Sequence, residues 1–152
     1  MKNTWSANNW DIKNQKIYSN IHLWEYYALD FNPPKGSLIY LYGDLGMWKT
    51  TFTQVFLKRL LGQELSITSP TYTYYNIYDS HYYHFDLYRL SWYNEFFQIG
   101  GEDILLGREE GLIFVEWPER IDQYINPDYS IYISAWIDEL HRNITITPQY
   151  LS

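Results

Sequence analysis

The sequence predicts an α/β fold in which a mixed β-sheet carries flanking helices, built as a single domain over residues 1–152. Two apolar runs, 38–42 and 112–115, are typical of strands that are buried on both faces. Between them, residues 49–61 carry apolar side chains at spacings of three and four, which indicates a helix. A chain of this length can bury about 70% of its unfolded surface in one core.

The other segments predict the rest of the sheet. One short strand is plausible within 1–20, and residues 21–30 are expected to be helical. The prolines within 32–36 are expected to interrupt regular secondary structure there. Gly62 is expected to end the helix over 49–61. Further elements are predicted as follows: strands at 72–78, 82–88, 129–137 and 144–147, a turn at Asp79-Ser80, and a helix at 95–106 interrupted by Gly100-Gly101. These elements predict a central parallel pair flanked by antiparallel strands.

The composition argues against several classes of site. The chain has no cysteine, which excludes disulfides and thiolate zinc sites, and its four histidines form no H-E-x-x-H motif. A net charge of −7 argues against autonomous nucleic-acid binding. No apolar stretch reaches membrane-spanning length, so we expect a cytoplasmic protein without membrane association. The 20% aromatic content indicates either compositional drift or interaction surfaces.

The most informative segment is 43–50, which reads Gly-Asp-Leu-Gly-Met-Trp-Lys-Thr. It matches the phosphate-binding pattern G-x-x-x-x-G-K-[ST] except that Trp48 stands at the second glycine. Between a strand and a helix, such a loop directs backbone N–H groups at an anion. Lys49 would then reach the phosphates of a nucleotide, and the Thr50 hydroxyl would bind Mg²⁺. This pattern alone does not exclude the alternative interpretation, a glycine-bearing turn that is followed by a Lys-Thr pair by chance.

A phosphate-binding loop needs acidic and polar partners, and three candidates occur. Glu116 directly follows the apolar run 112–115, where a carboxylate would face a ligand crevice. Asp86 lies near the end of another predicted strand, and Thr71 could sense a γ-phosphate through its hydroxyl. The alternative interpretations are that Glu116 is a solvated residue at a strand end, that Asp86 is an exposed residue paired with Arg89, and that Thr71 belongs to an ordinary turn.

Three blocks of the sequence together resemble one known family. They are 40–51, then 69–73 with 84–90 (His-Phe-Asp-Leu-Tyr-Arg-Leu), and then 115–120 (Val-Glu-Trp-Pro-Glu-Arg). Their order and spacing resemble TsaE, the small bacterial P-loop ATPase of tRNA threonylcarbamoyladenosine synthesis. The resemblance runs from about Leu38 to Arg120 and implies a P-loop NTPase-like mixed sheet.

The resemblance also implies a function. TsaE-like proteins bind ATP with Mg²⁺, hydrolyse it slowly, and act on a complex of TsaB and TsaD. TsaD transfers the threonylcarbamoyl group to adenosine 37 of tRNA, and the ATP cycle of TsaE is thought to reset the complex between turnovers. The chain is therefore expected to be an accessory ATP hydrolase of tRNA processing.

The family's site residues can be carried over by matching motif. Trp117 and Pro118 would shape the site wall or a partner surface. The implied nucleotide-binding residues are Gly43, Asp44, Leu45, Gly46, Trp48, Lys49, Thr50 and Thr51. The implied magnesium ligands are Thr50 and Glu116, and the implied catalytic residues are Asp86, Glu116 and Thr71.

Trp48 departs from the family pattern, which has Gly-Ala-Gly-Lys-Thr where this chain has residues 46–50. An indole there would occupy phosphate space or force the loop to rebuild, and an unusual backbone conformation would cost about 1–3 kcal/mol. Three interpretations follow: a working ATPase whose indole turns outward, a nucleotide-weak or inactive module that docks on partner proteins without ATP turnover, or a sequence artefact in an ordinary loop. A nucleotide kinase is disfavoured, since the arginines do not cluster as a lid.

Overall fold

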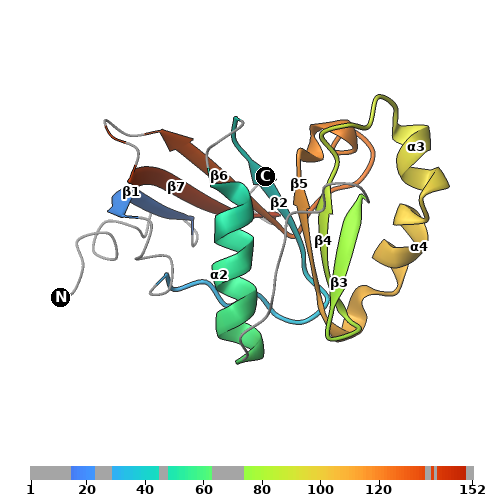
Figure 1. Cartoon of the computed structure of the whole chain (residues 1–152), viewed down its shortest axis with the longest axis horizontal. Helices are drawn as coiled ribbons and strands as arrows, with labels where there is room; N and C mark the ends of the chain where they lie inside the picture. Colours follow the sequence, from blue (N-terminus) through green and yellow to red (C-terminus); the bar gives the residue numbers. More distant parts are fainter. Residues whose placement is uncertain are drawn as a thin grey trace.

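The computed structural model describes residues 15–22, 29–44, 48–62, 74–135, 138 and 140–149. Its centre is a seven-stranded sheet with the strand order β1-β7-β6-β2-β5-β4-β3 (Figure 1). The strands are β1 (Lys16–His22), β2 (Leu38–Tyr42), β3 (Tyr75–Tyr78), β4 (Tyr82–Asp86), β5 (Leu112–Glu116), β6 (Tyr129–Ala135) and β7 (His141–Pro148).

The sheet is mixed, as predicted, but its parallel part is larger than the predicted pair. Strands β4, β5, β2 and β6 run parallel to one another. Strands β3 and β7 are antiparallel to their neighbours β4 and β6, and β1 is antiparallel to β7. The alternating pattern of β6 reports one more exposed face but carries no information about strand direction.

The helices connect and cover this sheet. They are α2 (Lys49–Leu61), α3 (Tyr93–Gln98) and α4 (Gly101–Leu106), with short 3₁₀ turns η3 (Arg108–Glu110) and η4 (Pro118–Arg120). The predicted end of α2 is confirmed, because Gly62 takes a φ of 66° and donates its N–H to the Lys58 carbonyl. The predicted interruption is confirmed as well, since Gly100 has a φ of 85° and separates α3 from α4. No helix in the described ranges combines the length and apolar character needed to cross a bilayer.

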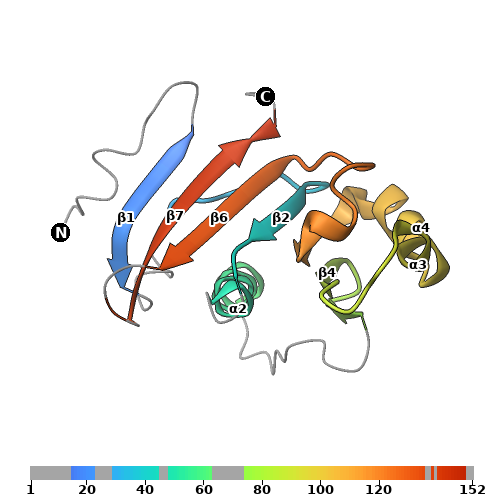
Figure 2. The ribbon, with the colours of Figure 1, turned by 90° about the horizontal axis from the view of Figure 1, so that it is seen from above.

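Two apolar cores lie on opposite faces of the sheet. Helix α2 covers one face, where Phe52, Phe56 and Leu57 pack with residues of β2, β5, β6 and β7 (Figure 2). On the other face, Phe96 of α3 and Leu105 of α4 pack with residues of β2, β4 and β5. Every residue of β5 is buried, because both faces of this strand are covered. That burial explains why its sequence reads as a continuous apolar run.

The helix predicted over 21–30 is wrong where the structure describes it. Ile21 and His22 belong to β1, and residues 29–30 are not helical. The segment 23–28 lies outside the described residues. Strand β1 forms because Tyr18 and Ile21 are fully buried and their backbones pair with β7. This long-range pairing outweighs a local helical pattern.

Candidate functional site

The loop after β2 leads into α2 at the edge where the parallel strands β2, β4 and β5 end (Figure 1). Gly43 and Asp44 follow the last residue of β2, Asp44 is exposed, and Thr51 is half-buried in the first turn of α2. Three predicted site residues lie outside the described residues: Leu45, Gly46 and Thr71. The other predicted residues can be placed, and most of them approach this edge.

Trp48 precedes α2 and adopts a left-handed backbone conformation, with φ 73° and ψ 30°. Its carbonyl accepts the first helical hydrogen bond, from the Phe52 N–H at 3.0 Å. A left-handed conformation costs a non-glycine residue roughly 1–2 kcal/mol, whereas glycine adopts it freely. The backbone at this position is therefore the one that the second glycine of the motif would favour.

The indole of Trp48 lies against β7. The ring is 37% exposed, and its centroid is 5.6 Å from the guanidinium carbon of Arg142. A guanidinium over an indole face is attracted by the ring quadrupole, by about 0.5–1 kcal/mol at a partly exposed site. This contact offsets part of the backbone strain and holds the indole beside β7.

Lys49, the first residue of α2, is almost completely buried, with 4% exposure. Its ammonium donates to the Gly43 carbonyl at 2.5 Å and lies 4.0 Å from the centroid of the Trp117 ring. Burial lowers the pKa of Lys49, while the neighbouring carboxylates, foremost that of Glu116, act in the opposite direction. The Lys49 side chain is thus held at the Gly43 carbonyl, close to the carboxylates at the strand ends.

Thr50 and Glu116 are in direct contact. The Thr50 hydroxyl donates to Oε2 of Glu116 at 2.6 Å, although the two residues are 66 positions apart. Glu116 is the last residue of β5 and is 4% exposed. Nε2 of His84 lies 2.5 Å from the same Oε2. One carboxylate oxygen therefore links α2, β4 and β5.

Asp86 is the last residue of β4 and pairs with Glu116 in the parallel register of β4 and β5. Its Oδ1 accepts the Tyr88 N–H at 3.0 Å. Burial raises the pKa of Asp86, and the charge of Glu116 adds to this. The Tyr88 N–H and, after it, the charge of Lys49 lower the pKa without cancelling the rise. Asp86 and Glu116 thus form a pair of carboxyl groups beside the buried lysine.

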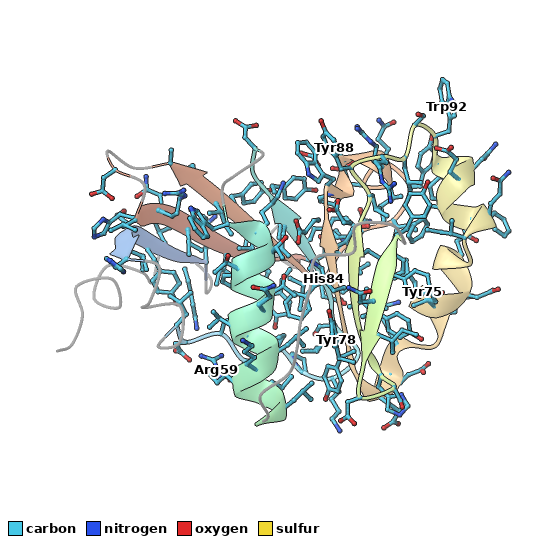
Figure 3. All side chains as sticks on the ribbon, in the orientation of Figure 1. Arg59, Tyr75, Tyr78, His84, Tyr88 and Trp92 are labelled. Atoms are coloured by element: carbon cyan, nitrogen blue, oxygen red, sulfur yellow. The ribbon has the colours of Figure 1, made fainter. Side chains whose placement is uncertain are left out.

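Aromatic residues form one wall of this site. Trp117 has a left-handed φ of 58°, and its ring centroid lies 5.0 Å from that of Tyr88. Arg120 links the segment 117–120 to Tyr88 by donating a hydrogen bond to the Tyr88 carbonyl at 3.0 Å. Figure 3 shows Tyr88 at the end of the molecule where the parallel strands finish. The ring of Trp117 in this wall therefore covers the Lys49 ammonium.

The donor set fits a magnesium ion with a nucleotide better than a metal alone. The described residues hold no group of three His, Cys, Asp or Glu side chains arranged for a metal. Magnesium in nucleotide sites takes one or two carboxylate or hydroxyl ligands, and phosphates and waters complete its shell. Thr50 and Glu116 could provide such ligands, and Asp86 adds a carboxylate beside them.

Sequence reasoning missed His84. The signals were its place in the block 84–90 and its spacing, since His84 and Asp86 are two residues apart and therefore share one face of a strand. Its contact with Glu116 joins residues 32 positions apart. No local pattern identifies such a pair.

The backbone at Trp48 leads to a stability prediction. We expect Trp48→Gly to be more stable than Trp48→Ala by about 1 kcal/mol, because both lack the indole and only alanine is strained at φ 73°. Urea unfolding of the two variants measures the difference. Equal stabilities, or a more stable alanine variant, would contradict the left-handed conformation.

Asp86 leads to a prediction on pH. Because the folded-state pKa is raised, ionised Asp86 disfavours folding, and stability falls as the pH rises from the ordinary carboxyl range through the raised pKa. We expect Asp86→Asn to be more stable than the native chain at pH 7, with an advantage that shrinks toward about pH 4. Urea unfolding across this range tests it. Asp44→Asn, at an exposed position, is the control, and an advantage independent of pH would refute the argument.

Comparison with known proteins agrees with the geometry. The family described as threonylcarbamoyl adenosine biosynthesis protein TsaE matches residues 20–144. The tRNA threonylcarbamoyladenosine biosynthesis protein TsaE of Treponema pallidum is 36% identical over 115 residues, 74% of this chain and 82% of that protein. Its counterpart in Haemophilus influenzae is 36% identical over 124 residues, 80% of this chain and 76% of that protein.

A solved structure shows the same architecture. The crystal structure of YdiB from Bacillus subtilis superposes on this chain with a TM-score of 0.61 and 28% sequence identity. The superposition covers 90% of this chain and 86% of the YdiB chain. The predicted P-loop NTPase-like α/β fold is thereby confirmed. From the extent of the family match and the identity to its members, the chain belongs to the TsaE family.

Proposed function

We propose that this chain binds ATP with Mg²⁺ at the loop between β2 and α2 and hydrolyses it as an accessory ATPase of tRNA threonylcarbamoyladenosine synthesis at adenosine 37. Its partner is then a complex of the TsaB–TsaD type, which the ATP cycle resets. The observation that carries this proposal is the convergence of Lys49, Thr50, Asp86 and Glu116 at one edge of the sheet, with Thr50 Oγ1 2.6 Å from Glu116 Oε2.

Each residue has a role in this proposal. The ammonium of Lys49 binds the phosphates, which requires it to exchange its contact with the Gly43 carbonyl for phosphate oxygens. Thr50 and Glu116 hold Mg²⁺, which neutralises charge developing on the phosphates. Asp86 lies beside Glu116 and orients the attacking water. Its raised pKa suits a carboxyl group that accepts a proton.

A second candidate function is a docking module that binds its partners with little or no nucleotide. The observation that favours it is Trp48, a strained, bulky residue at the position of a phosphate-contacting glycine. Binding of Mg–ATP by the native chain separates the two functions. Micromolar affinity supports the ATPase, and binding only after removal of the indole supports the docking module.

Removal of the indole is expected to raise the affinity for Mg–ATP. Trp48→Gly takes the side chain off the phosphate-binding loop and leaves a residue suited to the left-handed backbone. Calorimetric titration of Mg–ATP into the native chain and this variant measures the change. Trp92→Ala, which alters an indole that is 72% exposed at the start of α3, is the control. Equal or weaker binding by Trp48→Gly would contradict the expectation.

Removal of the Glu116 carboxylate is expected to abolish the Mg²⁺ dependence of ATP binding while the fold stays intact. Glu116 ends the buried strand β5, and its carboxylate is the group in contact with Thr50. Titration of ATP into Glu116→Ala with Mg²⁺ and with a chelator measures this, and circular dichroism checks the fold. Glu110→Ala, at an exposed position before β5, should keep the native dependence. An unchanged dependence in Glu116→Ala would argue against its role.

A further inference from the structure

His84 is a buried histidine with no role in the function proposed above. It lies in the middle of β4 and is 0% exposed (Figure 3). Side chains alternate along a strand, so His84 shares a face with Tyr82 and Asp86. Tyr82 belongs to the apolar core under α2, which places this face toward α2. A buried imidazole in an otherwise apolar layer needs a hydrogen-bond partner.

That partner is the Glu116 carboxylate. Nε2 of His84 lies 2.5 Å from Oε2, the oxygen that also accepts the Thr50 hydroxyl at 2.6 Å. Two contacts from opposite sides, one from β4 and one from α2, hold the same oxygen. A glutamate side chain has three rotatable bonds, and these contacts fix the end of it in one position. The carboxylate is thereby aimed at Thr50 before any ligand arrives.

The other ring nitrogen indicates which way this hydrogen bond runs. Nδ1 of His84 is buried and has no hydrogen-bond partner among the residues that the structure describes. A proton on Nδ1 would be a buried donor without an acceptor in this part of the chain, which is costly. A proton on Nε2 instead donates to Oε2, a carboxylate oxygen that accepts readily. The Nε2–H tautomer therefore fits both nitrogens.

We propose that His84 is a positioning residue, which orients Glu116 as a ligand of Mg²⁺ by donating an Nε2–H hydrogen bond to Oε2. This inference rests on the proposed function, because it assigns His84 a role in the same site. Groups that orient a metal-binding carboxylate typically change metal affinity by 10–100-fold when they are removed. The effect of His84 on ATP binding then acts through its contact with Glu116.

Three variants test this proposal in the full chain. His84→Leu removes the donor, and His84→Gln keeps an N–H donor that is as many bonds from Cβ as the histidine Nε2. His81→Leu is a matched control, because His81 is an exposed histidine in the turn before β4. Thermal melting first confirms that each variant is folded. ATP is then titrated calorimetrically into each protein, once with Mg²⁺ and once with a chelator.

We expect His84→Leu to lose about tenfold in affinity for Mg–ATP. Without Mg²⁺, its ATP affinity should stay within about twofold of native, because the phosphate-binding loop is intact. His84→Gln should recover a large part of the loss, and His81→Leu should match the native chain. Native Mg–ATP affinity in His84→Leu, or an equal loss with and without Mg²⁺, would overturn the positioning role.

A second measurement needs no nucleotide. Long-range ¹H–¹⁵N correlations of the imidazole in the free protein should show His84 protonated at Nε2 and unprotonated at Nδ1, and the signals should vanish in His84→Gln. The opposite tautomer would overturn the proposal. If the native chain binds ATP with no dependence on Mg²⁺, the proposed function fails. An Nε2–H tautomer would then show only that His84 is a structural partner of Glu116, and its positioning role would be overturned as well.

Discussion

The carboxylate of Glu116 joins three elements that are far apart in the chain. Its backbone ends the buried strand β5, and its Oε2 contacts Thr50 of α2 and His84 of β4. Since the side chain is only 4% exposed, water cannot replace these partners at low cost. Both contacts therefore form only when α2 packs on the sheet, and β4 pairs with β5, in the positions that bring Thr50 and His84 to this one carboxylate. The two apolar cores provide the rigidity that this agreement needs.

Around this carboxylate, burial disfavours the charged forms of the neighbouring ionisable side chains. It lowers the pKa of Lys49 and raises the pKa of Asp86, and the two groups partly compensate each other. A fold selected for stability alone would fill this volume with apolar side chains. Buried charges that oppose folding are characteristic of sites where a ligand provides the missing compensation. The polar content of this edge is thus better explained by binding than by stability.

Trp48 illustrates how a motif position is defined by the backbone. The left-handed conformation persists although tryptophan replaces glycine, because α2 must begin at Lys49 and the Trp48 carbonyl must accept from Phe52. The surrounding structure over-determines this conformation, which is the condition under which strain survives. The side chain then takes the space that remains, beside Arg142.

Elements whose patterns are local can be predicted from the sequence alone. Residues 38–42 and 112–115 are read from continuous apolar runs, and 49–61 from helical periodicity, because burial on both faces or on one stripe leaves a signature in neighbouring residues. The order of the motifs likewise placed Lys49, Thr50, Asp86 and Glu116 among the candidates. Their roles stay predictions.

Features that depend on distant partners become visible only in the folded chain. These are the parallel direction of β4 and β6, the strand rather than helix at 21–22, and the contact between His84 and Glu116. The reason is that strand direction and side-chain pairing are set by hydrogen bonds between segments tens of residues apart. A local sequence pattern contains the propensity of a segment, but it does not contain the neighbour against which that segment packs.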